Sequence, residues 1–273
     1  YSMAEIWRGI RAPRRVGSKL NSLYHRGGDS YNTAGIDIFE REWDNLYILD
    51  ACRADYFQEL LSNHRPSESP AVVTSRGSET KEWVEANFSG RRLHDVVYVS
   101  ANSWLPKLQG SINAEVYKFI SVDWDVDGSN VSTPQQVAEK ALEAAERYPQ
   151  KRLLVHFMQP HFPYLTEFGK NQFPNESGKD MDDIIRENEG TEEEVRRAYR
   201  ENLDFVLPVA LKLAKSVEGH SVISADHGEL LGERQSPLPV QQYGHPGGVY
   251  VPELVNVPWL DLGGEPRTIQ NGK

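Results

Sequence analysis

The sequence predicts an α/β fold with a central, mostly parallel mixed sheet sandwiched by helices. Short apolar runs that favour strands alternate with segments of ten or more residues whose apolar positions follow helical spacing. This alternation is typical of right-handed crossovers between parallel strands, with helices on both faces of the sheet. Two of the strand-like runs end on carboxylates, Asp50 and Asp226, and sheets of this kind bind ligands beyond the carboxyl ends of their strands.

Five short apolar runs are the predicted strands. β-branched, aromatic and other apolar residues dominate them, as expected of strands buried in a sheet. In chain order the runs are 45–49, 71–73, 96–99, 153–157 and 221–225.

Four segments between these runs predict helices. Residues 51–61 follow the first strand, and residues 78–88 place their large apolar side chains on one side. Thr133 opens the third helix, because Pro134 occupies the first helical position and alanines follow at helical spacing. The fourth helix, 192–217, is long and amphipathic.

Two regions lack a clear period, and the chain begins with a basic segment. Residues 168–190 are polar and predict a loop or lid, and the tail after Pro252 is rich in Pro and Gly and predicts irregular structure. We expect a basic N-terminal arm over 1–35 and a single domain over 36–273. The arm contains Arg8, Arg11, Arg14, Arg15, Lys19 and Arg26. It is either a solvated helix or a surface for anionic lipid or a partner.

Composition excludes several classes of protein. With 273 residues, 38% of them hydrophobic, the chain can bury a sizeable core. Its net charge of −10 disfavours a nucleic-acid partner. No apolar run approaches the roughly 18 residues of a membrane span, and no secretory signal is visible. Cys52 is the single cysteine, which excludes an internal disulfide framework and indicates a cytoplasmic protein.

The strand-end carboxylates predict a divalent metal site. Asp226 and His227 follow a strand directly, and Gly228 permits the turn that lets both side chains reach one ion. Asp50 ends another strand. Carboxylate with imidazole suits a divalent cation, with Zn²⁺, Mn²⁺, Mg²⁺ and Ca²⁺ all open. The alternative is that each aspartate only caps the turn that follows it.

Hydroxyl groups precede the 78–88 helix. Ser78 and Thr80 could be simple N-caps. A hydroxyl at a helix N-terminus also faces free N–H groups and the positive end of the helix dipole, which favour a phosphate or sulfate. A nearby cation would lower the pKa of such a hydroxyl and make it a nucleophile.

Two histidine-bearing turns complete the candidate chemistry. His156 ends a strand, and His161 follows in a loop stiffened by prolines, where it could protonate a leaving oxygen or bind anionic oxygens. His156 could equally be a structural core histidine. His245 lies in a glycine-rich turn and is a further ligand or phosphate contact. Arg53 and Arg76 are candidate anion contacts, with a solvated turn residue as the alternative for Arg76.

Four segments resemble, in the same order, the sulfatase-like hydrolase and transferase branch of the alkaline phosphatase superfamily. They are 48–55, 77–80, 156–164, and 224–233 with the following Tyr-Gly-His of 243–245. The resemblance covers roughly residues 44 to 259. It implies a mainly parallel sheet between helices, with a metal at the strand ends.

The resemblance also implies residue roles. Asp50, Asp226 and His227 would ligate the metal, and the nucleophile would be Thr80, with Ser78 second. His161 and His245 would bind the substrate or a second ion.

The departures from the family pattern favour phosphate over sulfate. The chain lacks the Cys-x-Pro-x-Arg segment that sulfatases convert to formylglycine. Ala51 stands where many sulfatases have a second Asp, and Gln159 stands where a carboxylate is common. These two positions favour one tightly held ion over a matched pair.

Three functions follow as hypotheses. The first is a metal-dependent hydrolase or transferase of phosphate (or sulfate) esters, acting on a small-molecule, glycan or lipid-headgroup ester. The second is a catalytically degenerate protein that binds an anionic ligand or glycan, motivated by Ala51 and Gln159. The third is peripheral membrane contact through the basic N-terminus, tested by its sensitivity to salt.

Overall fold

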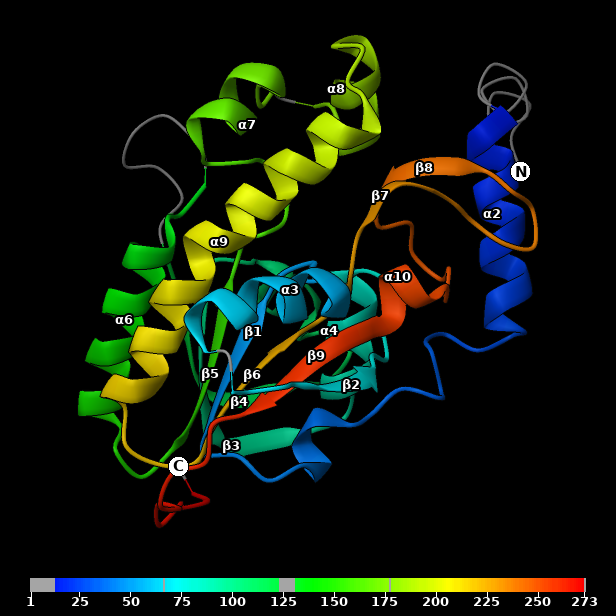
Figure 1. Ribbon diagram of the computed structural model, residues 1–273. Helices are drawn as coiled ribbons and strands as arrows, with labels where there is room; N and C mark the ends of the chain where they lie inside the picture. The colour runs from blue at the N-terminus through cyan, green and yellow to red at the C-terminus, as the bar shows by residue number, and fades with distance from the viewer. Residues whose placement is uncertain (1–12, 66, 123–130, 177, 273) are drawn as a thin grey trace.

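The computed structural model describes residues 13–65, 67–122, 131–176 and 178–272. Within these ranges a seven-stranded sheet lies between two layers of helices (Figure 1). The strands are β1 (Asn45–Leu49), β2 (Ala71–Thr74), β3 (Arg92–Ser100), β4 (Glu115–Ser121), β5 (Arg152–Phe157), β6 (Ser221–Ala225) and β9 (Asn256–Asp261). Their order across the sheet is β2-β9-β6-β1-β5-β3-β4. The predicted alkaline phosphatase-like architecture is confirmed.

The sheet is parallel except at β9. β1 pairs in parallel with β5 and β6, and β3 pairs in parallel with β4 and β5. β9 runs antiparallel between β2 and β6. The prediction of an irregular tail after Pro252 was therefore wrong, because α10 (Pro252–Val255) and β9 lie there. Pro258 stands inside β9 and masked the strand pattern.

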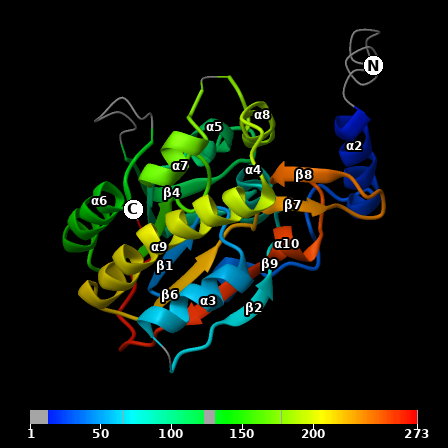
Figure 2. The same ribbon diagram turned by 45° about the horizontal axis from the view of Figure 1, so that its top comes forward.

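The helices divide between the two faces of the sheet. They are α2 (Pro13–Arg26), α3 (Ala54–His64), α4 (Thr80–Phe88), α5 (Trp104–Leu108), α6 (Pro134–Arg147), α7 (Glu167–Gln172), α8 (Met181–Glu187) and α9 (Glu192–Ser216). One core joins alternate β1 residues, Tyr47 and Leu49, to α3, α6 and α9. The other joins Leu46 and Ile48 to α4 and α5. Figure 2 shows α3 and α9 side by side.

Helix boundaries follow local chemistry. Thr133 caps α6 in a capping box with Gln136, and Pro134 occupies its first turn, as predicted. Thr191 and Glu194 form the same box at the start of α9. The prediction of a loop over 168–190 was wrong, because the short helices α7 and α8 lie there, and both are too short to show a clear period.

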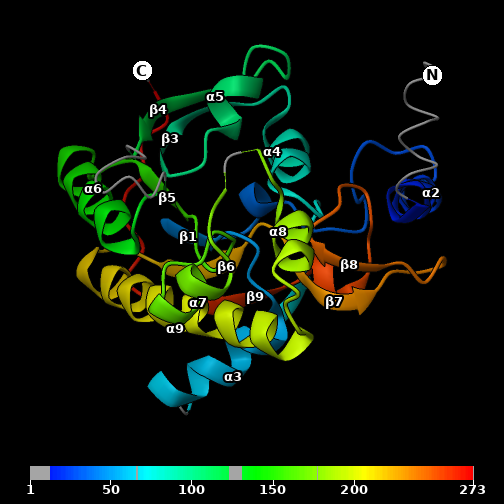
Figure 3. The same ribbon diagram turned by 90° about the horizontal axis from the view of Figure 1, so that it is seen from above.

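A small hairpin and an N-terminal helix lie beside the sheet. β7 (Leu230–Arg234) and β8 (Gln241–Gly244) pair antiparallel, and α2 packs beside them (Figure 3). The predicted basic arm is thus helical over 13–26, whereas Arg8 and Arg11 lie outside the described residues. No helix among the described residues is long and apolar enough to cross a membrane.

Tyr199 on α9 fixes the turn that follows β1. Its hydroxyl donates to the Ala51 carbonyl at 2.7 Å and accepts from the Arg53 amide at 2.9 Å. Ala51 has a positive φ of 61°, which is unfavourable for a residue with a Cβ. The tyrosine therefore stabilises a turn that the local sequence does not favour.

We predict that Tyr199→Phe lowers the free energy of unfolding by about 1–3 kcal/mol, because a buried carbonyl and a buried amide lose their partner. Urea denaturation measures the change. Tyr24→Phe is the control, since Tyr24 is 69% exposed and its hydroxyl faces water. Equal stability of the two variants would contradict this role.

Candidate active site

The carboxyl ends of β1 and β6 bring the predicted metal ligands together. Leu49 and Ala225 are paired in register, so Asp50 and Asp226 follow at neighbouring positions. Both carboxylates are buried, as is His227. His227 Nε2 lies 3.5 Å from Asp50 Oδ1 and 3.3 Å from Asp226 Oδ2. These three residues form a group that could hold a metal ion.

Thr80 lies next to the group formed by Asp50, Asp226 and His227. It is the first residue of α4, and its Oγ lies 3.4 Å from each Asp50 oxygen and 3.2 Å from His227 Nε2. The backbone N–H groups of the first turn of α4, which have no partner within the helix, lie at the same end of α4 as Thr80. The Thr80 hydroxyl, a helix N-terminus that favours anions, and the three metal-type ligands therefore lie close together.

Ser78 lies close in sequence but serves another purpose. Its buried Oγ accepts from the amides of Gly248 and Val249 at 2.8 and 3.3 Å and lies 3.2 Å from Glu82 Oε2. These bonds tie the start of α4 to the turn that carries His245. Ser78 thus makes structural contacts, whereas Thr80 contacts the metal-type ligands.

The tautomer of His227 leaves one nitrogen free for a ligand. Its Nδ1 lies 2.8 Å from the Gly228 carbonyl, which can only accept a hydrogen bond. Nδ1 therefore carries the proton, and the lone pair of Nε2 points to Asp50 and Thr80. Gly228 is needed for space, because a Cβ there would lie 2.1 Å from the Glu253 carbonyl oxygen.

Burial and mutual repulsion set the protonation of the carboxylates. Burial and the neighbouring Asp50 raise the pKa of Asp226 to about 7. Burial opposes the charge of Asp50 as well, but His161, His156 and His227 hold the pKa of that carboxyl well below its usual range. Burial and the positive His245 lower the pKa of His227 to about 3. Two closely spaced acids and one neutral imidazole are thus present together.

The donor set fits a divalent cation. Asp226 Oδ1 accepts from the amides of Ala51 and His227, whereas Asp226 Oδ2 is buried without a hydrogen-bond partner among the described residues. An oxygen left in this state costs free energy unless a cation or a proton meets it. Ala51 stands where many sulfatases have a second Asp, and its backbone amide donates to the Asp226 carboxylate.

His156 lies against both carboxylates. It is fully buried, with Nε2 3.5 Å from Asp50 Oδ2 and 3.6 Å from Asp226 Oδ2. Its Nδ1 lies 2.8 Å from the Tyr98 hydroxyl. Full burial and the contacts of His156 with both acids favour the structural role that the sequence also allowed, and its contact with a substrate stays a prediction.

A second group lies next to the first. His161, Glu229 and His245 also offer ligand atoms within reach of one ion. His245 Nδ1 lies 2.8 Å from Glu229 Oε1, and the His245 ring centroid is 4.8 Å from that of His161 and 4.5 Å from that of His227. Burial opposes its charge, but Glu229 raises the pKa of His245 to about 9. A protonated His245 therefore lies beside His227 at neutral pH.

Sequence reasoning missed two members of the site. Glu229 is the last residue of the Asp-His-Gly-Glu segment, and its position three residues after Asp226 was the available signal. Asn102 donates to Asp50 Oδ2 at 3.0 Å and follows β3 at the same edge of the sheet. No residue pattern marked Asn102, because a lone asparagine after a strand is common in turns.

The two arginines lie in ion pairs. Arg53 binds Asp55 and Glu233, each at 2.7 Å, and Arg76 binds Asp37 at 2.8 Å. Carboxylates already neutralise both guanidinium groups, and the contact of each arginine with an anion stays a prediction. Gln159 is buried and donates to the Ser132 carbonyl at 3.1 Å, which gives it a structural role.

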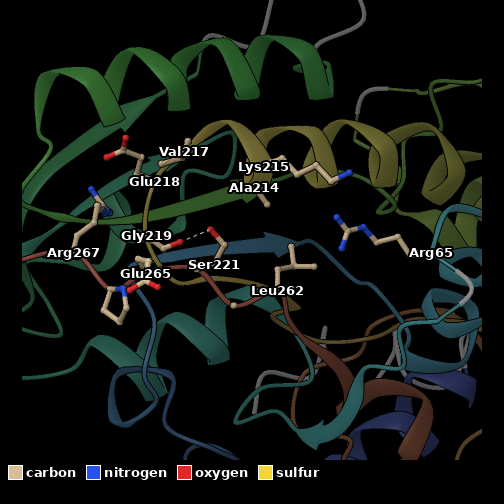
Figure 4. Close-up of a pocket in the computed structure, with 13 residues that line it drawn as sticks. Arg65, Ala214, Lys215, Val217, Glu218, Gly219, Ser221, Leu262, Glu265 and Arg267 are labelled. Carbon is tan, nitrogen blue, oxygen red and sulfur yellow. Dashed lines mark hydrogen bonds between the residues drawn. The ribbon is translucent and has the colours of Figure 1, made fainter.

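A separate hollow opens at the other end of the sheet. It has a volume of about 510 Å³ and lies among the residues that surround the start of β6, including Ser221 (Figure 4). Arg65, Lys215 and Arg267 reach toward it from three segments (Figure 4). Asp226 follows the opposite end of the same strand, so this hollow is not part of the candidate site.

No protein-family model and no curated protein matches the sequence. Solved structures do match. The integral membrane protein lipooligosaccharide phosphoethanolamine transferase A from Neisseria meningitidis is 15% identical with a TM-score of 0.56, and the match covers 81% of this chain and 47% of that one. The chain thus spans about half the length of that transferase.

Separately solved domains match over more of their length. The soluble domain of the same transferase is 15% identical with a TM-score of 0.55, over 81% of this chain and 76% of that one. The C-terminal periplasmic domain of EptC from Escherichia coli, in complex with Zn, is 14% identical with a TM-score of 0.52, over 81% and 72%.

We predict that metal affinity depends on pH through Asp226. Binding must displace its proton, so the Kd for Mn²⁺ or Zn²⁺ should rise about tenfold per pH unit below 7 and level off above it. Titration calorimetry in buffers of different ionisation enthalpy should detect about one proton released near pH 6. A Kd that is constant from pH 5.5 to 8 would contradict this coupling.

We also predict that Glu229→Gln lowers the pKa of His245 from about 9, because burial is then opposed only by the weaker effects of Asp50 and Glu79. Proton NMR of the metal-free protein measures it. Since folding raises this pKa, the His245–Glu229 pair stabilises the metal-free native protein fully below pH 6.5, and that stability is lost as pH rises through 9. An unchanged pKa in the variant would exclude Glu229 as its cause.

Proposed function

We propose that this protein is a metal-dependent phosphoester transferase in which Thr80 is the nucleophile. The observation that carries the proposal is the position of the Thr80 hydroxyl, at a helix N-terminus and within 3.4 Å of Asp50 and His227. One hydrogen-bond acceptor would satisfy the Thr80 hydroxyl, so folding alone does not require its contacts with three ligand-type atoms. The same arrangement suits attack on a phosphorus atom whose oxygens face a cation and free amides.

Asp50, Asp226 and His227 would hold the ion. A divalent cation bound there supplies charge stabilisation for the non-bridging phosphate oxygens and lowers the pKa of the Thr80 hydroxyl. Mn²⁺ and Zn²⁺ suit the mixed oxygen and nitrogen donors best. The Zn complex of the EptC domain supports Zn²⁺ as the first ion to test.

The chain's own residues define the remaining steps. Thr80 Oγ forms a bond to phosphorus as the bond from phosphorus to the leaving oxygen breaks, giving a phosphothreonine ester. His245, protonated at neutral pH, supplies a proton to the leaving oxygen, and His161 lies beside it. An acceptor hydroxyl then attacks the same phosphorus and passes its proton to His245, while the bond from phosphorus to Thr80 Oγ breaks and Oγ takes back from water the proton that it gave to water in the first step.

The similar structures narrow the substrate class. The Neisseria meningitidis protein is by name a lipooligosaccharide phosphoethanolamine transferase. We therefore propose a phosphodiester of a lipid or glycan headgroup as the donor. The second hypothesis, a degenerate binding protein, is less favoured, because Ala51 and Gln159 make structural hydrogen bonds and two groups of residues could each hold an ion.

The test uses p-nitrophenyl esters of phosphoethanolamine and of phosphoglycerol, with the phosphate monoester and the sulfate ester as comparisons. We predict diester turnover that requires Mn²⁺ or Zn²⁺. Thr80→Ala should lower kcat by on the order of 10³-fold or more while the metal Kd changes little. Intact-protein mass spectrometry should find the phospho-adduct on native enzyme and not on Thr80→Ala.

Ser78→Ala is the matched control. It should still form the adduct, with a raised KM and lower stability, because the amides of Gly248 and Val249 lose their acceptor. An adduct on Thr80→Ala, or its loss in Ser78→Ala, would assign the nucleophile elsewhere. Anion binding without turnover of any ester would favour the degenerate protein.

A further inference from the structure

Exposed apolar side chains gather on one helix. Among the described residues, large hydrophobic side chains with high exposure number eight, and four of them lie on α2. These four are Val16 (45% exposed), Leu20 (51%), Leu23 (56%) and Tyr24 (69%). A fifth, Leu238, is 40% exposed in the turn of the β7–β8 hairpin beside α2. Such clustering at one place marks an interaction surface, whereas single exposed residues do not.

The spacing places these four residues on one stripe. Val16, Leu20 and Leu23 follow each other at four and three residues, and Tyr24 adjoins them, so all lie along one side of the helix. We define Val16, Leu20, Leu23 and Tyr24 as the α2 stripe.

The other side of α2 is firmly packed on the hairpin. A Cβ at Gly17 would lie 2.5 Å from Val240, so the helix and the hairpin are in direct contact. Asn21 is fully buried, donates to Gln235 and to the Leu238 carbonyl, and accepts from the Leu238 amide. His25 Nε2 lies 2.8 Å from the Ser236 carbonyl. The α2 stripe is therefore exposed although its helix is fixed in place.

A buried ion pair ties this helix to the candidate site. Arg26 donates to Glu82 Oε1 at 3.0 Å, and Glu82 is 1% exposed on the first turns of α4. Tyr250 also donates to Glu82, at 2.8 Å, and Glu82 accepts from the Ser78 amide at 2.9 Å. α2 is thus a built part of the domain that carries Thr80.

The charge of α2 opposes that of the rest of the chain. The helix contains Arg14, Arg15, Lys19 and Arg26 and no acidic residue, although the whole chain carries a net charge of −10. Arg15 reaches Asp183 at 3.4 Å and stays 71% exposed. Arg14 and Lys19 are exposed and form no ion pair within the part of the chain that the structure describes. Cations therefore flank an apolar stripe.

We propose that α2 docks the protein on an anionic lipid surface, with the α2 stripe in the interface and Arg14, Arg15 and Lys19 against the headgroups. An apolar stripe flanked by cations, with a tyrosine at its border, matches an in-plane interfacial helix. Face-to-face pairing with a second copy would bring like charges together without a carboxylate on the helix. The choice of a lipid partner rests in part on the proposed function, whose donor carries a lipid or glycan headgroup.

Vesicle flotation of the full chain tests the proposal. The probes are vesicles of equal parts phosphatidylglycerol and phosphatidylcholine, and vesicles of phosphatidylcholine alone. Native protein should float with the anionic vesicles and lose affinity as salt rises. Leu20→Glu/Leu23→Glu should weaken this binding at least tenfold. The matched control Leu142→Glu, at a 37% exposed site on α6, should bind as native.

A charge variant separates the two contributions. Arg14→Gln/Lys19→Gln should weaken binding to anionic vesicles by roughly tenfold and reduce its salt dependence. Lys212→Gln, an exposed lysine on α9, is the matched control and should change neither. Native protein that ignores anionic vesicles, or α2 variants that bind as native, would overturn the proposal. So would a native dimer in sedimentation that Leu20→Glu/Leu23→Glu turns into a monomer, because a second copy would then cover the stripe.

Soluble-substrate turnover keeps the two proposals apart. Leu20→Glu/Leu23→Glu should hydrolyse the water-soluble aryl diesters at the native rate, since α2 stripe residues contact no site residue. Turnover without vesicle binding by the native protein would defeat only the docking proposal. Vesicle binding without turnover would support docking and defeat the proposed function.

Discussion

The close approach of two buried carboxylates governs the structure of this site. Asp50 and Asp226 follow adjacent parallel strands, so sheet pairing itself brings their charges together. Burying both without compensation would cost several kcal/mol, since each acid loses its hydration and repels the other. The protein balances Asp50 with histidines and an Asn102 hydrogen bond and leaves one oxygen of Asp226 without a partner in the described structure. This remaining imbalance is the reason that we propose a cation at the site.

The backbone around this pair is held by residues remote in sequence. Ala51 adopts a positive φ so that its amide can reach Asp226 Oδ1 at 3.1 Å, and Tyr199 holds the carbonyl of the same residue. Ser75 donates to the Asp226 carbonyl, which fixes the end of β6 from the strand on the far side of β9. The ligands are thus positioned by a helix and a sheet edge that share no motif with them, and such preorganisation gives metal sites their geometry.

The sequence was informative where chemistry and periodicity coincide. The strand-like runs that end on Asp50 and Asp226 predicted the parallel sheet and the close approach of these two carboxylates. β9 escaped prediction because Pro258 interrupts it and because its antiparallel pairing depends on contacts distant in the chain. The role of Ser78 escaped for the same reason, since its partners are amides at 248–249. Cytoplasmic placement and the boundary at residue 35 stay predictions, because folding geometry bears on neither.

Glu82 connects the surface helix α2 to α4, the helix that begins at Thr80. Its two oxygens take bonds from Arg26 and Tyr250 on one side and from the Ser78 amide on the other. The oxygens of a buried carboxylate need such hydrogen-bond partners, so α2, the His245 turn and the start of α4 constrain each other. Any force on α2, from a lipid surface or a partner, therefore acts on an element one hydrogen bond away from the helix that presents Thr80. The position of Thr80 and the attachment of the N-terminal helix therefore depend on the same buried carboxylate, Glu82.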